Sequence, residues 1–107
     1  MPVAIVANPD LSILTDRQRD AVNAVHRQLR ALGRTSLPGE RETVLPKLLV
    51  ASAELKRITT KVETQLTEYD NVLRERGATE AEDDLWIQNL RRLETMLAVL
   101  ARAKEVV

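Results

Sequence analysis

Apolar residues recur every seven positions in the middle of the chain, and this spacing predicts a long helix there. One such series consists of Leu48, Leu55, Val62 and Tyr69. Residues seven apart share one face of an α-helix, because seven residues complete about two turns. The series therefore predicts a helix over residues 43–76. Pro46 is compatible with the first turn of that helix, where a missing backbone N–H costs little.

A second heptad series predicts another long helix over residues 79–106. This series begins with Trp86, Leu93 and Leu100, and Leu90 and Leu97 form its partner series in the hairpin seam. Thr79 and Glu82 have the spacing of a capping box, in which each side chain accepts the backbone N–H of the other residue. A glycine just before Thr79 ends the preceding helix, so only a very short link joins the two helices. Two long helices joined in this way form an antiparallel, coiled-coil-like αα-hairpin.

A shorter helix is predicted before the hairpin, over residues 15–33. Its apolar stripe consists of Val22, Val25, Leu29 and Leu32. Thr15 and Gln18 supply a second capping box at its start. Residues 1–14 contain one short apolar run without a partner strand elsewhere, so we expect an extended N-terminal arm there. The predicted fold is therefore all-α, a three-helix bundle built on the long hairpin, with a single helical domain over residues 15–107.

The composition fits one helical domain and excludes several other classes of protein. The chain has 107 residues, no cysteine and only 2% aromatic residues. The absence of cysteine excludes disulfides, thiol catalysis and cysteine-bound zinc, and the low aromatic content disfavours a β-sandwich. The 16 basic and 16 acidic residues cancel, which argues against a nucleic-acid coat or a polybasic membrane binder. No apolar run is long enough for a signal peptide or a membrane span, so we expect a cytoplasmic protein, or a virion-interior one if it is phage-encoded.

The long helices carry more apolar residues than one seam between them can bury. Apolar residues point almost all round the first half of the second helix, and the third helix has a second stripe beside its heptad series. The short first helix can cover only part of this surface, and leftover apolar surface usually marks an interface. We therefore expect an oligomer or partner interface formed by Leu49, Val50, Leu85, Met96, Val99, Ala103 and Val106. In the alternative arrangement, the first helix and the arm cover all of these side chains.

Two sets of polar residues are further candidates for specific roles. Gln65 falls on a heptad core position, where a polar residue often fixes helix register or oligomeric state; ordinary solvation at the edge of the seam is the alternative. The polar face of the first helix carries a candidate anion-binding row formed by Arg19, Arg27, Arg30 and Arg34. A solvated helix face explains this row more simply, because no aromatic residues lie between the arginines to stack on bases.

The remaining chemically interesting residues fit structural roles. Glu80, Asp83 and Asp84 lie at the start of a predicted helix, where negative charge offsets the helix dipole. His26 is the only histidine and lies at the edge of an apolar stripe, which suits boundary packing. Because no nucleophile, base or metal-ligand cluster is recognisable, we expect no catalytic residues, no cofactor and no metal.

A non-enzymatic structural or interaction protein explains these features best. We expect a self-associating helical module, or a small component of a larger assembly such as a phage particle. Its partner would be another copy or a different protein, with no membrane contact. The alternative is a small regulatory protein that binds nucleic acid or an acidic partner through the arginine row. An all-helical enzyme is the least favoured hypothesis, because no arginine lies inside an apolar stripe to form a buried cationic site.

Overall fold

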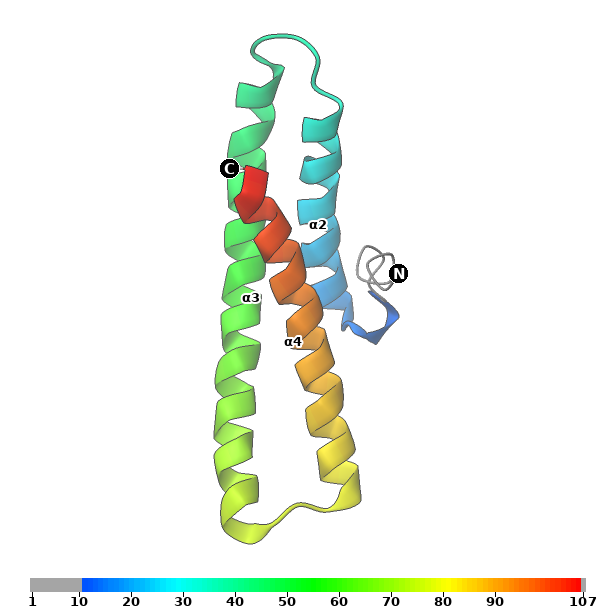
Figure 1. The fold of residues 1–107 in the computed structure, drawn as a ribbon, viewed down its shortest axis with the longest axis vertical. Coiled ribbons are helices and arrows are strands. Elements are labelled where there is room, and N and C mark those ends of the chain that lie inside the picture. Colours follow the sequence, from blue (N-terminus) through cyan, green and yellow to red (C-terminus); the bar gives the residue numbers. More distant parts are fainter. Residues whose placement is uncertain (1–10, 107) are drawn as a thin grey trace.

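Three α-helices form the part of the chain that the computed structural model describes, residues 11–106 (Figure 1). They are α2 (Asp16–Gly33), α3 (Glu40–Arg76) and α4 (Glu80–Val106), and a short 3₁₀ turn, η1 (Leu11–Ile13), precedes them. The predicted all-α fold, with its long α3–α4 hairpin and shorter first helix, is thereby confirmed. The first ten residues of the expected arm lie outside the described part of the chain.

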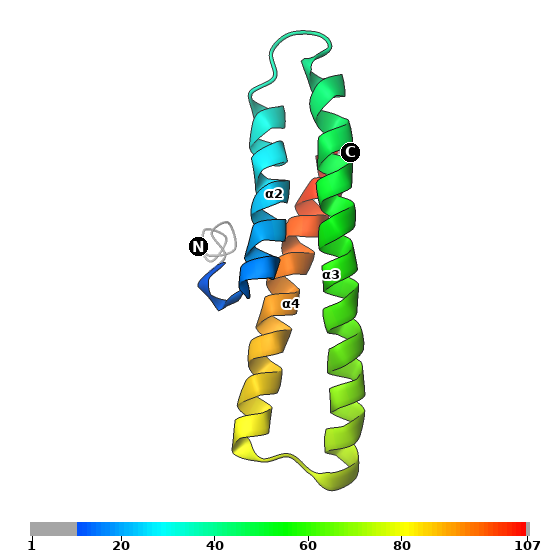
Figure 2. The ribbon, with the colours of Figure 1, turned by 180° about the vertical axis from the view of Figure 1, so that it is seen from behind.

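The molecule is a rod that measures 59 × 31 × 22 Å. Helix α3 runs along its whole length, and α2 lies beside only one half of α3 (Figures 1 and 2). Helix α4 returns from the far end of α3 and packs on both other helices. The hairpin end of the rod, residues 63–92, therefore consists of two helices, whereas three helices pack together in the other half.

Both predicted capping boxes are present. Thr15 Oγ1 accepts the Gln18 backbone N–H at 3.2 Å, and Gln18 Oε1 accepts the Thr15 N–H at 3.1 Å. Thr79 and Glu82 make the same pair of hydrogen bonds at the start of α4, at 3.2 and 3.0 Å. Each box satisfies N–H groups that have no partner within the helix, which fixes where the helix begins. Gly77 ends α3 with φ 81°, a conformation that favours glycine.

Helix α3 begins at Glu40, three residues before the predicted start. Pro46 accordingly lies inside the helix and not in its first turn. Proline cannot donate to the carbonyl four residues earlier, which here belongs to Glu42. Glu42 and Pro46 are both exposed, so water can satisfy that carbonyl and the helix continues. Gly39, with φ 96°, provides the turn that leads into α3.

The core lies where all three helices meet. Its most completely buried aliphatic side chains are Val22, Val25, Leu48, Leu55, Met96 and Val99. Burying an aliphatic side chain of this size stabilises the fold by roughly 1.5–3 kcal/mol. The three-helix half therefore holds most of the hydrophobic stabilisation, and the two-helix end has less.

The last residues of the expected arm are docked onto the bundle. Leu14 is buried in the core, and η1 packs against α4. Arg92 Nε donates to the Ile13 carbonyl at 2.6 Å, and Arg19 donates to the carbonyls of Leu11 and Leu14 at 3.3 and 3.0 Å. The prediction of an extended conformation over residues 11–14 is therefore wrong, because two arginines satisfy the carbonyls of a compact turn.

Candidate functional site, an apolar groove between the hairpin helices

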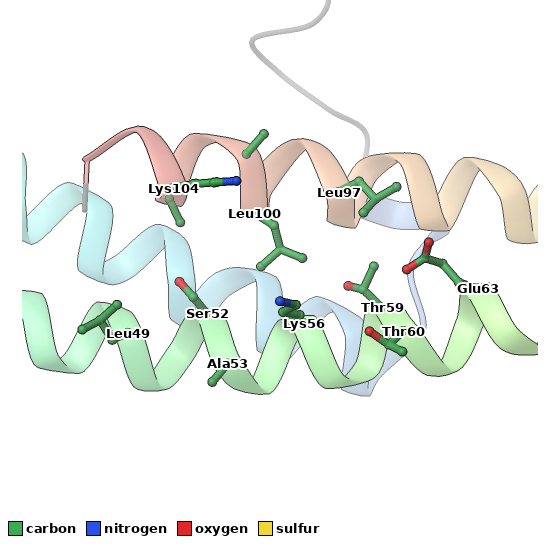
Figure 3. A pocket seen from close by; sticks show the side chains of 12 residues that line it. Leu49, Ser52, Ala53, Lys56, Thr59, Thr60, Glu63, Leu97, Leu100 and Lys104 are labelled. Carbon is green, nitrogen blue, oxygen red and sulfur yellow. The ribbon is translucent and has the colours of Figure 1, made fainter.

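An open groove of about 550 Å³ runs between α3 and α4 (Figure 3). The α3 side chains that line it lie between Leu49 and Glu63, and the α4 side chains lie between Leu97 and Lys104. No residue of α2 lines the groove, because α2 packs elsewhere on the two long helices. The groove is thus a part of the hairpin that the first helix leaves uncovered.

Small residues on both helices explain why the groove is open. Ser52, Ala53 and Ala101 line it, and their side chains are too short to fill the space between two helices. Two larger apolar side chains stand at its ends, where Leu49 is 51% exposed and Leu97 is 42% exposed, and Leu100 lies between them (Figure 3). On the floor, the buried Thr59 hydroxyl donates to the Leu55 carbonyl at 2.7 Å, whereas the buried Ser52 hydroxyl has no hydrogen-bond partner among the described residues.

The groove has opposite charges at its two ends. Figure 3 shows Lys104 near the end formed by Leu49 and Glu63 near the end formed by Leu97. Lys56 lies between them. All three charged side chains are exposed, and none makes an ion pair within residues 11–106. Their charges are therefore available to another molecule in the groove.

The structure divides the predicted interface residues into two groups. Leu49, Val50 and Leu85 are exposed, and only Leu49 lines the groove. Val106 is half-buried against the core.

Three of the predicted interface residues belong to the core. Met96, Val99 and Ala103 are at most 2% exposed, so the prediction that they form an outer interface is wrong. The reason is the path of α4, which packs on α2 as well as on α3. The second apolar stripe of α4 faces the other helices and is covered.

Leu97 is a groove residue that the heptad pattern placed in the wrong environment. Its series placed it in the seam between the long helices, yet it stands at the open end of the groove. A sharper signal was present in α3, where small and polar residues interrupt the apolar pattern along the groove, Thr59 and Thr60 near Leu97 and Ser52 and Ala53 toward the other end (Figure 3). Small and polar residues facing a leucine predict a hollow and not a packed seam.

Gln65 is exposed in the structure and is not buried in the hairpin seam. It lines two shallow hollows on the surface of α3, one beside Tyr69 and Leu85 and one beside Arg17 and Lys61. Within a single chain, the predicted burial of Gln65 at a core position is therefore wrong. Helix α2 only begins at this level, with Arg17 beside the second hollow, so this edge of the seam faces solvent.

The predicted arginine row is only partly available. Arg19 is half-buried and holds the carbonyls of Leu11 and Leu14, so it does not belong to an open face. Arg27, Arg30 and Arg34 are exposed and make no ion pair within residues 11–106. The row is thus three arginines long and lies at the end of α2 that is remote from η1.

His26 lies in a partly buried position between α2 and α4. Burial lowers its pKa from the usual 6.5, and the nearby positive charges of Arg102 and Arg30 lower it further. Its Nε2 atom is buried and has no hydrogen-bond partner among the described residues. The neutral imidazole therefore acts as a packing group, and protonation would place a third positive charge beside two arginines.

The acidic residues at the start of α4 serve the helix terminus. Glu82 accepts hydrogen bonds from Arg76, one of them at 3.1 Å, and from the Thr79 N–H, and these bonds lower its pKa to about 2. Glu80 and Asp83 are exposed in the first turn, where they oppose the helix dipole. Within residues 11–106, no group of three metal-ligating side chains lies close enough to hold an ion.

None of the helices described here is both long enough and apolar enough to cross a membrane. Comparison of the chain with models of known protein families, with curated protein sequences and with solved structures gives no significant match.

Proposed function

We propose that this chain is a non-enzymatic helical interaction module that associates with a second copy of itself through the α3–α4 groove. The observation that supports the proposal is the groove itself. Most of its lining surface is apolar, and Leu49 and Leu97 stand about half exposed at its ends. Exposed apolar surface of this kind on a small domain is a typical contact surface.

Covering the groove contributes favourably to association. Covering the exposed half of a leucine side chain contributes roughly 1 kcal/mol, half of the value for a fully buried one. In a symmetric pair both copies contribute Leu49 and Leu97, so each term counts twice. The smaller apolar atoms of the groove floor add to this sum.

The test is the molar mass in solution, measured by light scattering after size exclusion over a concentration series. We expect the mass to rise from 12.0 kDa toward twice that value as concentration increases. Leu97→Asp places a charge at the end of the groove and should keep the chain monomeric. A mass of 12.0 kDa at every concentration would refute the proposal.

Ile87→Asp is the matched control for Leu97→Asp. Both residues lie on α4 and both are 42% exposed, but Ile87 does not line the groove. The control variant should associate like the unmodified chain. Val99→Asp is unsuitable as a test, because Val99 is buried in the core and the charge would unfold the domain.

Binding of nucleic acid or an acidic protein through α2 is the second candidate function. It is supported by Arg27, Arg30 and Arg34, which are exposed without an acidic partner in the described part of the chain. Measuring the affinity for a DNA or RNA duplex at two salt concentrations tests it, because phosphate contacts give a steep salt dependence. Replacing all three arginines with glutamine should remove that dependence.

A further inference from the structure

Charge is segregated along the rod. Residues 63–92, which form the two-helix end, include eight acidic side chains and four basic ones. The other described residues, 11–62 and 93–106, include 12 basic and seven acidic side chains. The balanced total charge therefore hides an acidic hairpin end and a basic body.

The acidic charge of the hairpin end is only partly neutralised locally. Two of its four arginines are in ion pairs, Arg74 with Asp70 and Arg76 with Glu82. The six remaining carboxylates are exposed and make no ion pair within residues 11–106. They belong to Glu63, Glu68, Glu75, Glu80, Asp83 and Asp84. Exposed cations without a partner in the body include Arg27, Arg30, Arg34, Lys47, Lys56 and Lys104.

The groove has the same polarity as the whole rod and lies near its middle. Its α3 residues span 49–63, which includes Ile58, the midpoint of the helix that runs the length of the rod. A two-fold axis through this point would reverse the second copy. Groove to groove, this axis sets α3 on α3 and α4 on α4. The groove end of one copy that holds Glu63 and Leu97 then lies against the end of the other that holds Leu49 and Lys104.

From this complementarity we infer that two copies pair side by side and antiparallel, groove to groove, with the acidic hairpin end of each against the basic body of the other. This inference rests on the proposed self-association and specifies its geometry. A single two-fold contact uses the same surface on both copies and closes the assembly at a dimer.

Alternative arrangements of two copies are electrostatically or geometrically worse. A parallel pair would place two acidic hairpin ends side by side, and like charges at an interface oppose association. An end-to-end contact would pair the acidic end of one copy with the basic end of the next. It would leave both grooves open, however, and would continue into a filament. A rod face 59 Å long and at least 22 Å wide also offers more area than the ~800 Å² per partner of a standard interface.

A charge-exchange experiment tests the attraction between Glu63 of one copy and Lys104 of the other. Glu63→Lys should weaken the dimer roughly tenfold in Kd, because two symmetry-related attractions become repulsions. The double variant with Lys104→Glu restores opposite charges and should recover the original Kd. Within one chain these residues stand at opposite ends of the groove and make no ion pair, so recovery reports a contact between copies. Glu105→Lys is the control, since it changes the net charge equally but lies outside the groove.

A distance between the two hairpin ends tests the antiparallel orientation directly. The chain has no cysteine, so Ala78→Cys, in the exposed link between α3 and α4, accepts a single spin label. Pulsed electron paramagnetic resonance should give a label separation approaching the 59 Å length of the rod. A separation of one rod width, 22–31 Å, would mean a parallel pair and overturn the inference.

The outcomes separate this inference from the proposed function. A dimer with a short label distance would support self-association but refute the antiparallel arrangement. A dimer whose Kd is unchanged by the charge exchange would do the same. A mass that grows beyond a dimer with concentration points to end-to-end assembly and refutes it as well. A monomer under all conditions refutes the proposed function itself.

Discussion

Two adjacent residues of α4, Met96 and Leu97, make the sharpest test of the structure. The heptad pattern placed Leu97 in the hairpin seam and Met96 on an outer surface. In the structure Met96 is completely buried among the three helices, whereas Leu97 stands at the open end of the groove. Truncating each side chain to alanine should therefore have very different effects on the free energy of unfolding.

The expected magnitudes follow from the two environments. Met96→Ala leaves a cavity where three helices meet, and such substitutions cost roughly 2–5 kcal/mol. Leu97→Ala removes atoms that are already partly in water and leaves no closed cavity, so we expect about 1 kcal/mol or less. For a chain of this size, a loss of about 3 kcal/mol lowers Tm by roughly 10–20 °C.

Urea unfolding followed by circular dichroism measures both effects. With a slope of about 1–3 kcal/mol per molar urea, Met96→Ala should lower the midpoint by roughly 1–3 M and Leu97→Ala by much less. The measurements should be made at the lowest workable concentration, since Leu97→Ala also weakens the proposed dimer. If Leu97→Ala costs as much as Met96→Ala, the assignment of core and groove on α4 is wrong.

Three further predictions concern glycine, histidine and lysine positions. Gly77→Ala should destabilise the fold by about 1–2 kcal/mol, because φ is 81° there. Gly33→Ala, in a helical position with open space around it, should stabilise the fold by about 0.5–1 kcal/mol, and the same urea unfolding measures both changes. The pKa of His26 is lower in the folded chain than the usual 6.5, so the unfolded chain binds more protons and the free energy of unfolding should fall as pH drops through 6.5. His26→Gln should therefore reduce the difference in stability between pH 7.5 and 5.5. An unchanged difference would contradict this assignment. Lys56 lies near the inferred two-fold axis, where it would approach its symmetry mate, so Lys56→Gln should tighten the dimer several-fold by light scattering, and a weaker dimer would count against the axis.

The helices and their ends were predictable because local interactions determine them. The heptad series located both hairpin helices, and Thr15 and Thr79 marked two helix starts through hydrogen bonds to residues three positions away. The start of α3 was missed because Pro46 favours a first-turn position locally. The helix tolerates it further inside, where the unsatisfied carbonyl of Glu42 faces water.

The candidate site was only partly predictable, because it depends on which face of each helix another helix covers. Leu49 was correctly placed among exposed apolar residues, but Met96, Val99 and Ala103 were not. All of these residues lie on apolar stripes, and an apolar stripe in the sequence does not indicate which neighbouring helix covers it. In the sequence Arg19 likewise belongs to the arginine row, but in the structure its guanidinium donates to the carbonyls of Leu11 and Leu14.

The sequence by itself determined the all-helical class, the hairpin, the caps and the separation of acidic and basic segments. These properties depend on residues close together in the chain, or on composition alone. Only the tertiary structure decided that α2 packs away from the groove, that the second stripe of α4 is buried and that a hollow remains between α3 and α4. Packing of that kind depends on the volumes and crossing directions of helices far apart in sequence, which a one-dimensional pattern does not contain.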